Sequence, residues 1–570
     1  MKRTGIPVPL ILVCGLILAA GVLLVAAAAP GAGGPVSLVR IAKSPSLPLN
    51  VQTRLLIDVR QELATCLLAF ADRQDIDLLR RNRVPFTVLE RNVGRRELLV
   101  VGTRGPGDLA LLRAAGHAVA VEPRTAVFWT EMGSAAESVP VGLPRKAFPP
   151  RPVPYVRTPP AASQAPSGTL AQDPFIESIV SLVSSSDLAA RVQALQDFQT
   201  RYASTTNCEA AGEALFSALS ALGLDDVRFE PFTFSGSYAS RNVIAEKTGE
   251  TYPDDVYIVC AHYDSTSPSR LTEAPGADDN ASGTAAVLEA ARVLALHPLD
   301  YTVRFIAFSA EEWGLYGSRA YASAARSAGE RILGVVNLDM IAYADALPED
   351  LQIIVNADST WLGDLFLAAG SHYGIVGGTR TVDPSIVYSD HSPFWDNGYP
   401  ALLAIEDYPL ANPYYHRTTD TLATLDLDFF TSATRASVGL LAELAQPIRE
   451  GYPRTPVGVL GSWVVYRSVF SVLPAVHLAW TGQADAAGYN VYRSSHAHGE
   501  FLKANEMPVT GTEFTDSAVS LGGTYYYVIT AVGPTGLESN RSRPTVPAES
   551  SVRSSASART ISPLILKGAR

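Results

Sequence analysis

The residue of this sequence that first suggests metal chemistry is His262, which ends an apolar run in the segment CAHYDS. In a β-strand, residues i and i+2 share a face, so the carboxylate of Asp264 can approach the second ring nitrogen of His262. Carboxylates hold metal-bound histidines in one tautomer in this way. A lone His-x-Asp pair is common, so the pair indicates a metal site only if further ligands join it.

Three acidic segments follow along the chain. Asp278 and Asp279 lie in GADDNASG, before a helix expected over 284–296; Glu311 and Glu312 follow the apolar run 303–308; and Asp339 follows the run 335–338. Adjacent carboxylates before a helix also fit ordinary N-terminal capping, so that alternative stays open for the aspartate pair.

Successive parallel strands would bring these groups to one edge of a sheet, the rim where open α/β sheets bind ligands. Acids gathered there repel one another, and a bound cation is the simplest way to make them compatible. The segment YHRTTDT adds a second histidine, His416. Two imidazoles with three carboxylates suit a pair of zinc ions with one bridging carboxylate, whereas a site of carboxylates alone would favour magnesium or calcium.

The order of the segments HYDS, GADDNASG, EEWGLYGS, NLDM, SDH and YHRTTDT resembles that of the co-catalytic di-zinc aminopeptidases, the bacterial leucyl aminopeptidase group. Relatives of that group include glutamate carboxypeptidase, glutaminyl cyclase and the transferrin receptor ectodomain. The resemblance covers residues 175–447 and every metal-ligand segment. It implies an enzyme, a metallo-exopeptidase with two Zn²⁺ ions.

The resemblance also implies a role for each ligand. Asp279 would bridge the two zinc ions, Glu312 and His416 would complete one of them, and His262 and Asp339 would complete the other.

Further residues receive catalytic roles from the same resemblance. Glu311 matches the general base, Asp264 the partner of His262, and Tyr415 a residue that stabilises the tetrahedral intermediate in some members. The implied reaction is hydrolysis of the N-terminal peptide bond of peptides and proteins by a metal-bound hydroxide, with Glu311 moving the proton. One departure is that residues 383–390 lack the cysteine pair found in some secreted members.

Two other functions stay open. A carboxypeptidase or a glutaminyl cyclase can use the same scaffold, although the cyclase uses one zinc and would not need the full ligand set. A non-catalytic receptor or adhesion protein is the alternative from another class, and it predicts eroded ligands, of which this sequence has none.

The elements that must position these residues lie in 173–448. Strands are expected at 256–261, 302–308, 335–338 and 401–405, each a short apolar run with polar ends, typical of buried parallel strands. They alternate with amphipathic helical stretches, which predicts an α/β domain with a mostly parallel, doubly wound sheet covered by helices.

A small α+β domain is expected at 31–133. Residues 66–90 and 99–123 both read strand, helix, strand with a period of 33, which favours a split βαβ sandwich, although a chance likeness of two βαβ units stays open. A proline-rich linker is expected at 134–172, with basic residues at Arg145, Lys146 and Arg151 that suit proteolytic removal of the front domain.

Charge separates these two regions. Residues 31–172 carry a net charge of +7 and residues 173–448 carry −23. The front domain is therefore expected to act as an intramolecular inhibitor or chaperone, with a permanently attached accessory domain as the alternative.

After a linker at 449–463, residues 464–548 show short alternating strands separated by turns and resemble a fibronectin type III module, a β-sandwich. The resemblance rests on Trp480 and on Tyr526 as the tyrosine-corner residue. Such a module would attach the enzyme to a surface, polymer or partner. The tail at 549–570 is Ser-rich and expected to be disordered.

The N-terminal segment predicts that the protein works outside the cytoplasm. Residues 1–30 begin with Lys2 and Arg3 and run without charge from 10 to 29, as expected for a cleavable signal peptide or a retained membrane anchor. The protein is thus expected to be secreted or extracytoplasmic. The net charge of −11 argues against nucleic acid as a partner, and four scattered cysteines make no disulfide framework or zinc-thiolate cluster.

Overall fold

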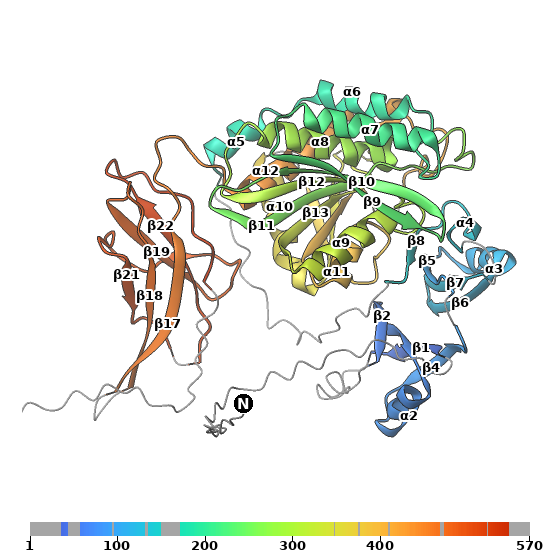
Figure 1. Ribbon diagram of the computed structural model, residues 1–570, viewed down its shortest axis with the longest axis horizontal. Coiled ribbons are helices and arrows are strands. Elements are labelled where there is room, and N and C mark those ends of the chain that lie inside the picture. Colours follow the sequence, from blue (N-terminus) through green and yellow to red (C-terminus); the bar gives the residue numbers. More distant parts are fainter. Residues whose placement is uncertain are drawn as a thin grey trace, which may run out of the picture.

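The computed structural model (Figure 1) describes residues 36–43, 57–93, 96–130, 135–149, 172–346, 348–373, 377–407, 411–467, 472–520 and 522–545. The expected export segment (1–30) and the expected tail (549–570) lie outside these residues, as does the linker from 150 to 171. Within the described ranges, no helix is both long and apolar enough to cross a lipid bilayer.

The central part of the chain (172–448) is built on an eight-stranded sheet with the order β15-β14-β16-β13-β11-β12-β10-β9. Its strands are β9 (Asp226–Phe234), β10 (Tyr238–Lys247), β11 (Tyr252–His262), β12 (Tyr301–Phe308), β13 (Arg331–Leu338), β14 (Leu351–Val355), β15 (Gly378–Val382) and β16 (Ala401–Ile405). The four expected strands are present as β11, β12, β13 and β16, and they stand next to one another in the sheet.

The sheet is mixed, which corrects the expectation of a mostly parallel sheet. The neighbours β12, β11, β13 and β16 run parallel. Toward the edges, β10 pairs antiparallel with both β12 and β9, and β14 pairs antiparallel with β16. At the edge, β14 and β15 run parallel and are joined by a crossover through α10, whereas the β9–β10 edge is a hairpin.

Helices cover both faces of this sheet (Figure 1). They are α5 (Pro174–Val180), α6 (Ser185–Gln196), α7 (Thr206–Ser220), α8 (Gly283–Leu294), α9 (Tyr316–Ala328), α10 (Thr360–Tyr373), α11 (Ser392–Asp396) and α12 (Leu427–Ala445), with short helical turns η1 (Ala277–Ser282), η2 (Ala357–Ser359) and η3 (Leu422–Thr424).

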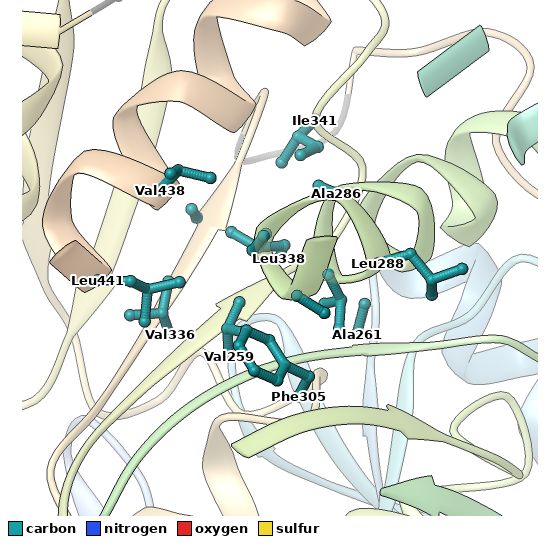
Figure 2. Close-up of a cluster of buried hydrophobic side chains, with 14 of the residues drawn as sticks. Val259, Ala261, Ala286, Leu288, Phe305, Val336, Leu338, Ile341, Val438 and Leu441 are labelled. Atoms are coloured by element: carbon teal, nitrogen blue, oxygen red, sulfur yellow. The ribbon is translucent and has the colours of Figure 1, made fainter. Parts of the chain in front are cut away.

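Strand β11 shows why both faces are covered. Val259 and Ala261 belong to a buried cluster shared with α8 and α12, whereas Ile258 and Cys260 belong to the cluster beneath α9 and α11. Alternate side chains of a strand point to opposite faces, so an apolar run buries both. Figure 2 shows Val259 beside Phe305 and Val336, in the same cluster as Val438 and Leu441 of α12.

The front part forms two separate four-stranded sheets, β2-β3-β1-β4 and β6-β7-β5-β8. Its elements are β1 (Ser37–Ala42), β2 (Asp58–Glu62), β3 (Cys66–Ala71), α2 (Arg73–Arg81), β4 (Phe86–Glu90), β5 (Leu99–Gly102), α3 (Pro106–Ala115), β6 (His117–Glu122), β7 (Thr125–Trp129), α4 (Ala135–Ser138) and β8 (Arg145–Ala147). The strand, helix, strand order expected twice is present twice. In each sheet an antiparallel strand lies between the two strands of the βαβ unit, so each unit is a split βαβ in a sheet of its own.

The expected start of the linker is wrong. Residues 135–149 belong to the front part, because β8 pairs antiparallel with β5 at the edge of the second sheet. An edge strand tolerates flanking prolines, here Pro144 and Pro149, since one side of its backbone needs no ladder partner. Arg145 and Lys146 are both buried, so they are not the exposed cleavage sites that the sequence suggested.

The second front sheet packs directly on the central part. Val101, Phe128 and Ala147 share one buried apolar cluster with Phe234 and Trp313 of the central part. At the edge of this cluster, Nζ of Lys146 lies 2.6 Å from Oδ2 of Asp396 in α11, and the two side chains are 1% and 7% exposed.

The C-terminal part consists of two three-stranded sheets, β17-β18-β21 and β20-β19-β22, which share one apolar cluster. Its strands are β17 (Val457–Arg467), β18 (Val472–Thr481), β19 (Gly488–Ser494), β20 (Leu502–Lys503), β21 (Glu513–Asp516) and β22 (Tyr526–Val532). The tyrosine whose hydroxyl bonds back to the backbone a few residues upstream is Tyr525, which accepts from the amide of Ser520 at 3.0 Å, and not the expected Tyr526. The fibronectin type III resemblance remains a prediction.

Candidate active site and metal centre

The residues singled out from the sequence meet at the carboxyl edge of the parallel strands. His262 is the last residue of β11, and Asp339 directly follows β13. Glu311 and Glu312 lie in the turn after β12, and Asp279 lies in η1 ahead of α8. His416 comes from the segment between β16 and α12, and all six side chains are buried.

The carboxylate of Asp279 lies between the two histidines. Its Oδ1 is 3.3 Å from Nε2 of His262, and its Oδ2 is 3.0 Å from Nε2 of His416. On one side, Oδ1 of Asp339 lies 3.5 Å from the same nitrogen of His262. On the other side, Oε2 of Glu312 lies 3.0 Å from Nε2 of His416.

These side chains form two groups of potential ligands among the described residues. The ligand atoms of Asp279, Glu312 and His416 all lie within 4.8 Å of one another, as do those of His262, Glu311 and Asp339. Within the described part of the chain, Oδ2 of Asp279 and Oε1 of Glu312 are buried without a hydrogen-bond partner. Buried polar atoms are normally satisfied, so nitrogen and oxygen atoms that converge unpaired fit a pair of cations with mixed ligands.

The pKa values of these clustered side chains are set by burial and by neighbouring charges. Burial opposes charge on the His416 ring, but the Glu312 and Asp279 carboxylates outweigh it and raise the pKa of His416 to about 9. Burial, together with Glu312 and Asp339, raises the pKa of Glu311 well above its ordinary value, against the opposing effect of His262. Like charges held this closely in a buried cluster repel one another, and a bound cation would relieve that repulsion.

The contacts of Asp264 differ from the expected pairing of its carboxylate with the His262 ring. Nδ1 of His262 lies 3.0 Å from the main-chain carbonyl oxygen of Asp264, whereas the nearest carboxylate oxygen is 3.7 Å away. The carboxylate instead accepts hydrogen bonds from the main-chain amides of Glu311 (3.1 Å) and Glu312 (3.3 Å). Asp264 therefore positions the glutamate turn as well as the histidine.

The structure adds supporting residues to which no role was given from the sequence. The Ser389 hydroxyl donates to Oδ2 of Asp339 at 2.5 Å and accepts from the Asn337 side chain at 2.7 Å. The Asp420 carboxylate accepts from the amides of Asp278 (2.8 Å) and Asp279 (3.1 Å). Ser389 and Asp420 lie in the segments SDH and YHRTTDT, so their place in the sequence was a usable signal.

The aspartate pair does not simply cap a helix. Asp278 accepts from the amide of Ala342 at 3.0 Å and from the side chain of Asn412 at 2.8 Å, while Asp279 faces the histidines. Neither carboxylate accepts a helix-capping bond in the described structure. The capping alternative is therefore wrong for this pair.

Tyr415 lies beside the second histidine. Its ring stacks on His416 with the ring centroids 3.8 Å apart, and it also contacts the apolar cluster of Met340 and Ile386. Burial, together with the carboxylates of Asp279 and Glu312, raises the pKa of Tyr415 well above its ordinary value. The phenol therefore stays protonated and able to donate a hydrogen bond.

Comparison with known proteins points to one family. Residues 242–441, from β10 into α12, match the profile of Peptidase family M28. The chain is 30% identical over 299 residues to leucine aminopeptidase 1 of Sclerotinia sclerotiorum, covering 49% of this chain and 75% of that protein. It is 28% identical over 305 residues to a probable leucine aminopeptidase of Trichophyton verrucosum, covering 51% and 81% respectively. In fold it is similar to LapB from Legionella pneumophila, with a TM-score of 0.50, 18% identity, and coverage of 62% of this chain and all of that one.

Proposed function

The chain belongs to peptidase family M28, and on this premise we propose that it is a zinc-dependent aminopeptidase that works outside the cytoplasm. Its substrates would be peptides and proteins with a free N-terminus, from which it removes the first residue. The observation that carries this proposal is the Asp279 carboxylate, whose two oxygens face two different histidines, each with a second acidic group beside it.

The residues would share two zinc ions as follows. Asp279 would contribute to both ions, Glu312 and His416 would hold one of them, and His262 and Asp339 would hold the other. The nitrogen and oxygen donors and the unpaired oxygens of Asp279 and Glu312 suit this assignment. When bound, zinc lowers the pKa of a coordinated water from 15.7 to about 7 and polarises the carbonyl of the substrate.

Glu311 is the proposed general base. It is buried in the group with His262 and Asp339, where a carboxylate could accept a proton from water and pass it to the leaving amine. The amide of Glu311 is held by Asp264, which restricts where the carboxylate can move. Because Glu311 also lies within ligand distance of His262 and Asp339, only experiment separates the role of base from that of ligand.

Tyr415 is the proposed donor to the oxygen that becomes negatively charged during attack on the carbonyl. Its stacking on His416 places the phenol at the pocket, and its raised pKa keeps the proton available.

The other parts of the chain have proposed roles of their own. We propose that the front part assists folding and restrains activity, and that the C-terminal part, taken as a fibronectin type III module, attaches the enzyme to a surface or polymer. The buried contacts of β8 support a front part that stays bound to the central part.

Zinc content and peptide hydrolysis test the proposed function together. We expect about two zinc ions per purified chain, and cleavage of reporter peptides with a free N-terminus but not of N-blocked ones. Cleavage of a C-terminal reporter would favour a carboxypeptidase, and cyclisation of N-terminal glutamine would favour a glutaminyl cyclase. A chain that binds zinc but converts none of these substrates would favour the non-catalytic receptor.

A further inference from the structure

Arg201 is a buried arginine that binds main-chain carbonyls close to the metal centre. It is 0% exposed, and its guanidinium donates to carbonyl oxygens from three different segments. Nε donates to Tyr263 at 2.7 Å, Nη1 to Pro275 at 2.6 Å and to Leu195 at 3.2 Å, and Nη2 to Gly276 at 2.8 Å. Within the described ranges it forms no ion pair with a carboxylate, so its hydrogen bonds organise backbone.

Two of these segments carry proposed metal ligands. Tyr263 lies directly after His262, and Gly276 lies three residues before Asp279. One guanidinium therefore links the end of β11 to the loop that brings the bridging carboxylate into place. A planar group with five donors in fixed directions can hold two backbone segments in register, which a single ammonium cannot do.

A second connection runs through the main chain of the same residue. The Arg201 amide donates to the Ser265 hydroxyl at 3.1 Å, and that hydroxyl donates to the carbonyl of Ala274 at 2.7 Å. Gly276 has φ +50°, and a Cβ at that position would lie 2.4 Å from the carbonyl oxygen of Asp279. The loop from Ala274 to Asp279 can therefore adopt few other conformations that would keep Asp279 in place if the guanidinium is lost.

The charge of Arg201 also bears on the acidic pocket. Burial lowers the pKa of the guanidinium, while the carboxylates of Asp420, Asp264 and Asp279 act in the opposite direction. An arginine in proteins stays charged even when it is buried. The guanidinium thus places one positive charge near the acidic side chains of the proposed metal centre. This charge offsets part of the repulsion among the carboxylates before a metal ion is bound.

We propose that Arg201 is a positioning residue of the metal centre, which sets the distance between His262 and Asp279 through the backbone of the two loops. This inference rests on the proposed function, because it assumes that these two residues bind zinc. It assigns to Arg201 no contact with substrate or metal.

The experiment compares the full-length protein with its variants Arg201→Met and Arg201→Lys. Arg145→Met is the matched control, because Arg145 is also buried and its guanidinium donates to the carbonyls of Ala136 and Val139, away from the metal ligands. Zinc affinity is measured by competition with a chelator, ligand geometry by the visible spectrum of the Co²⁺-substituted protein, and folding by thermal unfolding.

For Arg201→Met we expect zinc affinity to fall roughly 10- to 100-fold, the range seen when groups that orient metal ligands are removed. The Co²⁺ spectrum should change, and Arg201→Lys should recover part of the affinity through its charge and its remaining donors. Arg145→Met should lose stability but keep the zinc affinity and the spectrum of the unchanged protein.

Wild-type zinc affinity and an unchanged Co²⁺ spectrum in Arg201→Met would overturn the inference. If Arg201→Met does not fold, Arg201→Lys is used instead. An unchanged zinc affinity and Co²⁺ spectrum in Arg201→Lys would again overturn the inference. A lower zinc affinity with an altered Co²⁺ spectrum would support it. A wild-type protein that binds no zinc would instead refute the proposed function, which is a distinguishable result.

Discussion

The buried pair of Lys146 and Asp396 should decide how firmly the front part is held on the central part. Removing one partner of a buried ion pair costs about 3–5 kcal/mol, because the other charge is left without compensation. Here the costs should differ. Arg319 is half-buried close to Asp396 and helps to lower the pKa of that carboxyl, so Lys146→Met leaves the anion with a second cation nearby. Asp396→Asn leaves Lys146 with no anion in this role.

We therefore expect a loss of about 3 kcal/mol for Lys146→Met and of nearer 5 kcal/mol for Asp396→Asn. The double variant Lys146→Met/Asp396→Leu should be close to the unchanged protein or more stable. Burial lowers the pKa of Lys146 against the effect of Asp396, and it raises that of Asp396 against the effect of Lys146. Both pKa shifts indicate that the free energy lost by burying the two charges exceeds the free energy gained from their attraction.

The assay is dissociation of the front part after cleavage at a protease site introduced within 150–171. At about 1.4 kcal/mol per tenfold change, the dissociation constant should rise roughly 10²-fold for the lysine variant and more than 10³-fold for the asparagine variant. Added salt should have little effect, since buried charges are screened much less than exposed ones. Single variants that bind as tightly as the unchanged protein, or a fragment released by salt alone, would refute this reasoning.

The remaining predictions concern the active site and two distant carboxylates. Glu311→Gln should keep about two zinc ions while turnover falls by about 10²- to 10⁴-fold, whereas Asp279→Asn should lose zinc; metal analysis showing the reverse would place the residues one position out of register. Truncation after Glu450 should leave dipeptide turnover nearly intact but lower the melting temperature, because Asp300 loses the donors Thr455 and Asn540; a folded but inactive fragment would contradict this. Burial raises the pKa of Glu443 to about 7 from 4.5, so its contribution to stability is complete below pH 4.5 and is lost as the pH rises through about 7. Glu443→Gln should therefore be more stable than the unchanged protein by about 1–3 kcal/mol above pH 7 and no different below pH 4.5, measured by denaturant unfolding across pH.

The sequence was most informative where a short apolar strand ends in a chemical group. His262 and Asp339 could be placed at one edge because the ends of neighbouring parallel strands coincide. Arg201 could not be found in this way, since its partners are main-chain carbonyls as many as 75 residues away, and any residue type offers a carbonyl. The corner residue is Tyr525 and not Tyr526 for another reason: three consecutive tyrosines offer the same residue type, and a shift of one residue moves a side chain to the opposite face.

The prolines around β8 indicated a linker, whereas the structure has an edge strand of the front part at this position. Proline signals a linker because it cannot continue a central strand, but the edge of a sheet needs hydrogen bonds on one side only. The outermost strands β9 and β15 were also hidden, because they are mostly half-buried or exposed, carry polar residues and so lack the apolar run that marks a buried strand. The four central strands could therefore be predicted from the sequence, whereas the outer strands of the sheet and their antiparallel pairing could not.

The turn that carries Glu311, the proposed general base, is held from two sides. Asp264 accepts its amides from within the central part, and on the other side the amide of Ala147 in β8 donates to the carbonyl of Gly314 at 3.3 Å. Trp313, between the glutamates and this glycine, lies in the apolar cluster shared with the front part. A cut within 150–171 would leave all of these contacts in place. Any release of restraint on Glu311 therefore requires the front part to dissociate, because cleavage alone removes no contact that β8 makes with the turn.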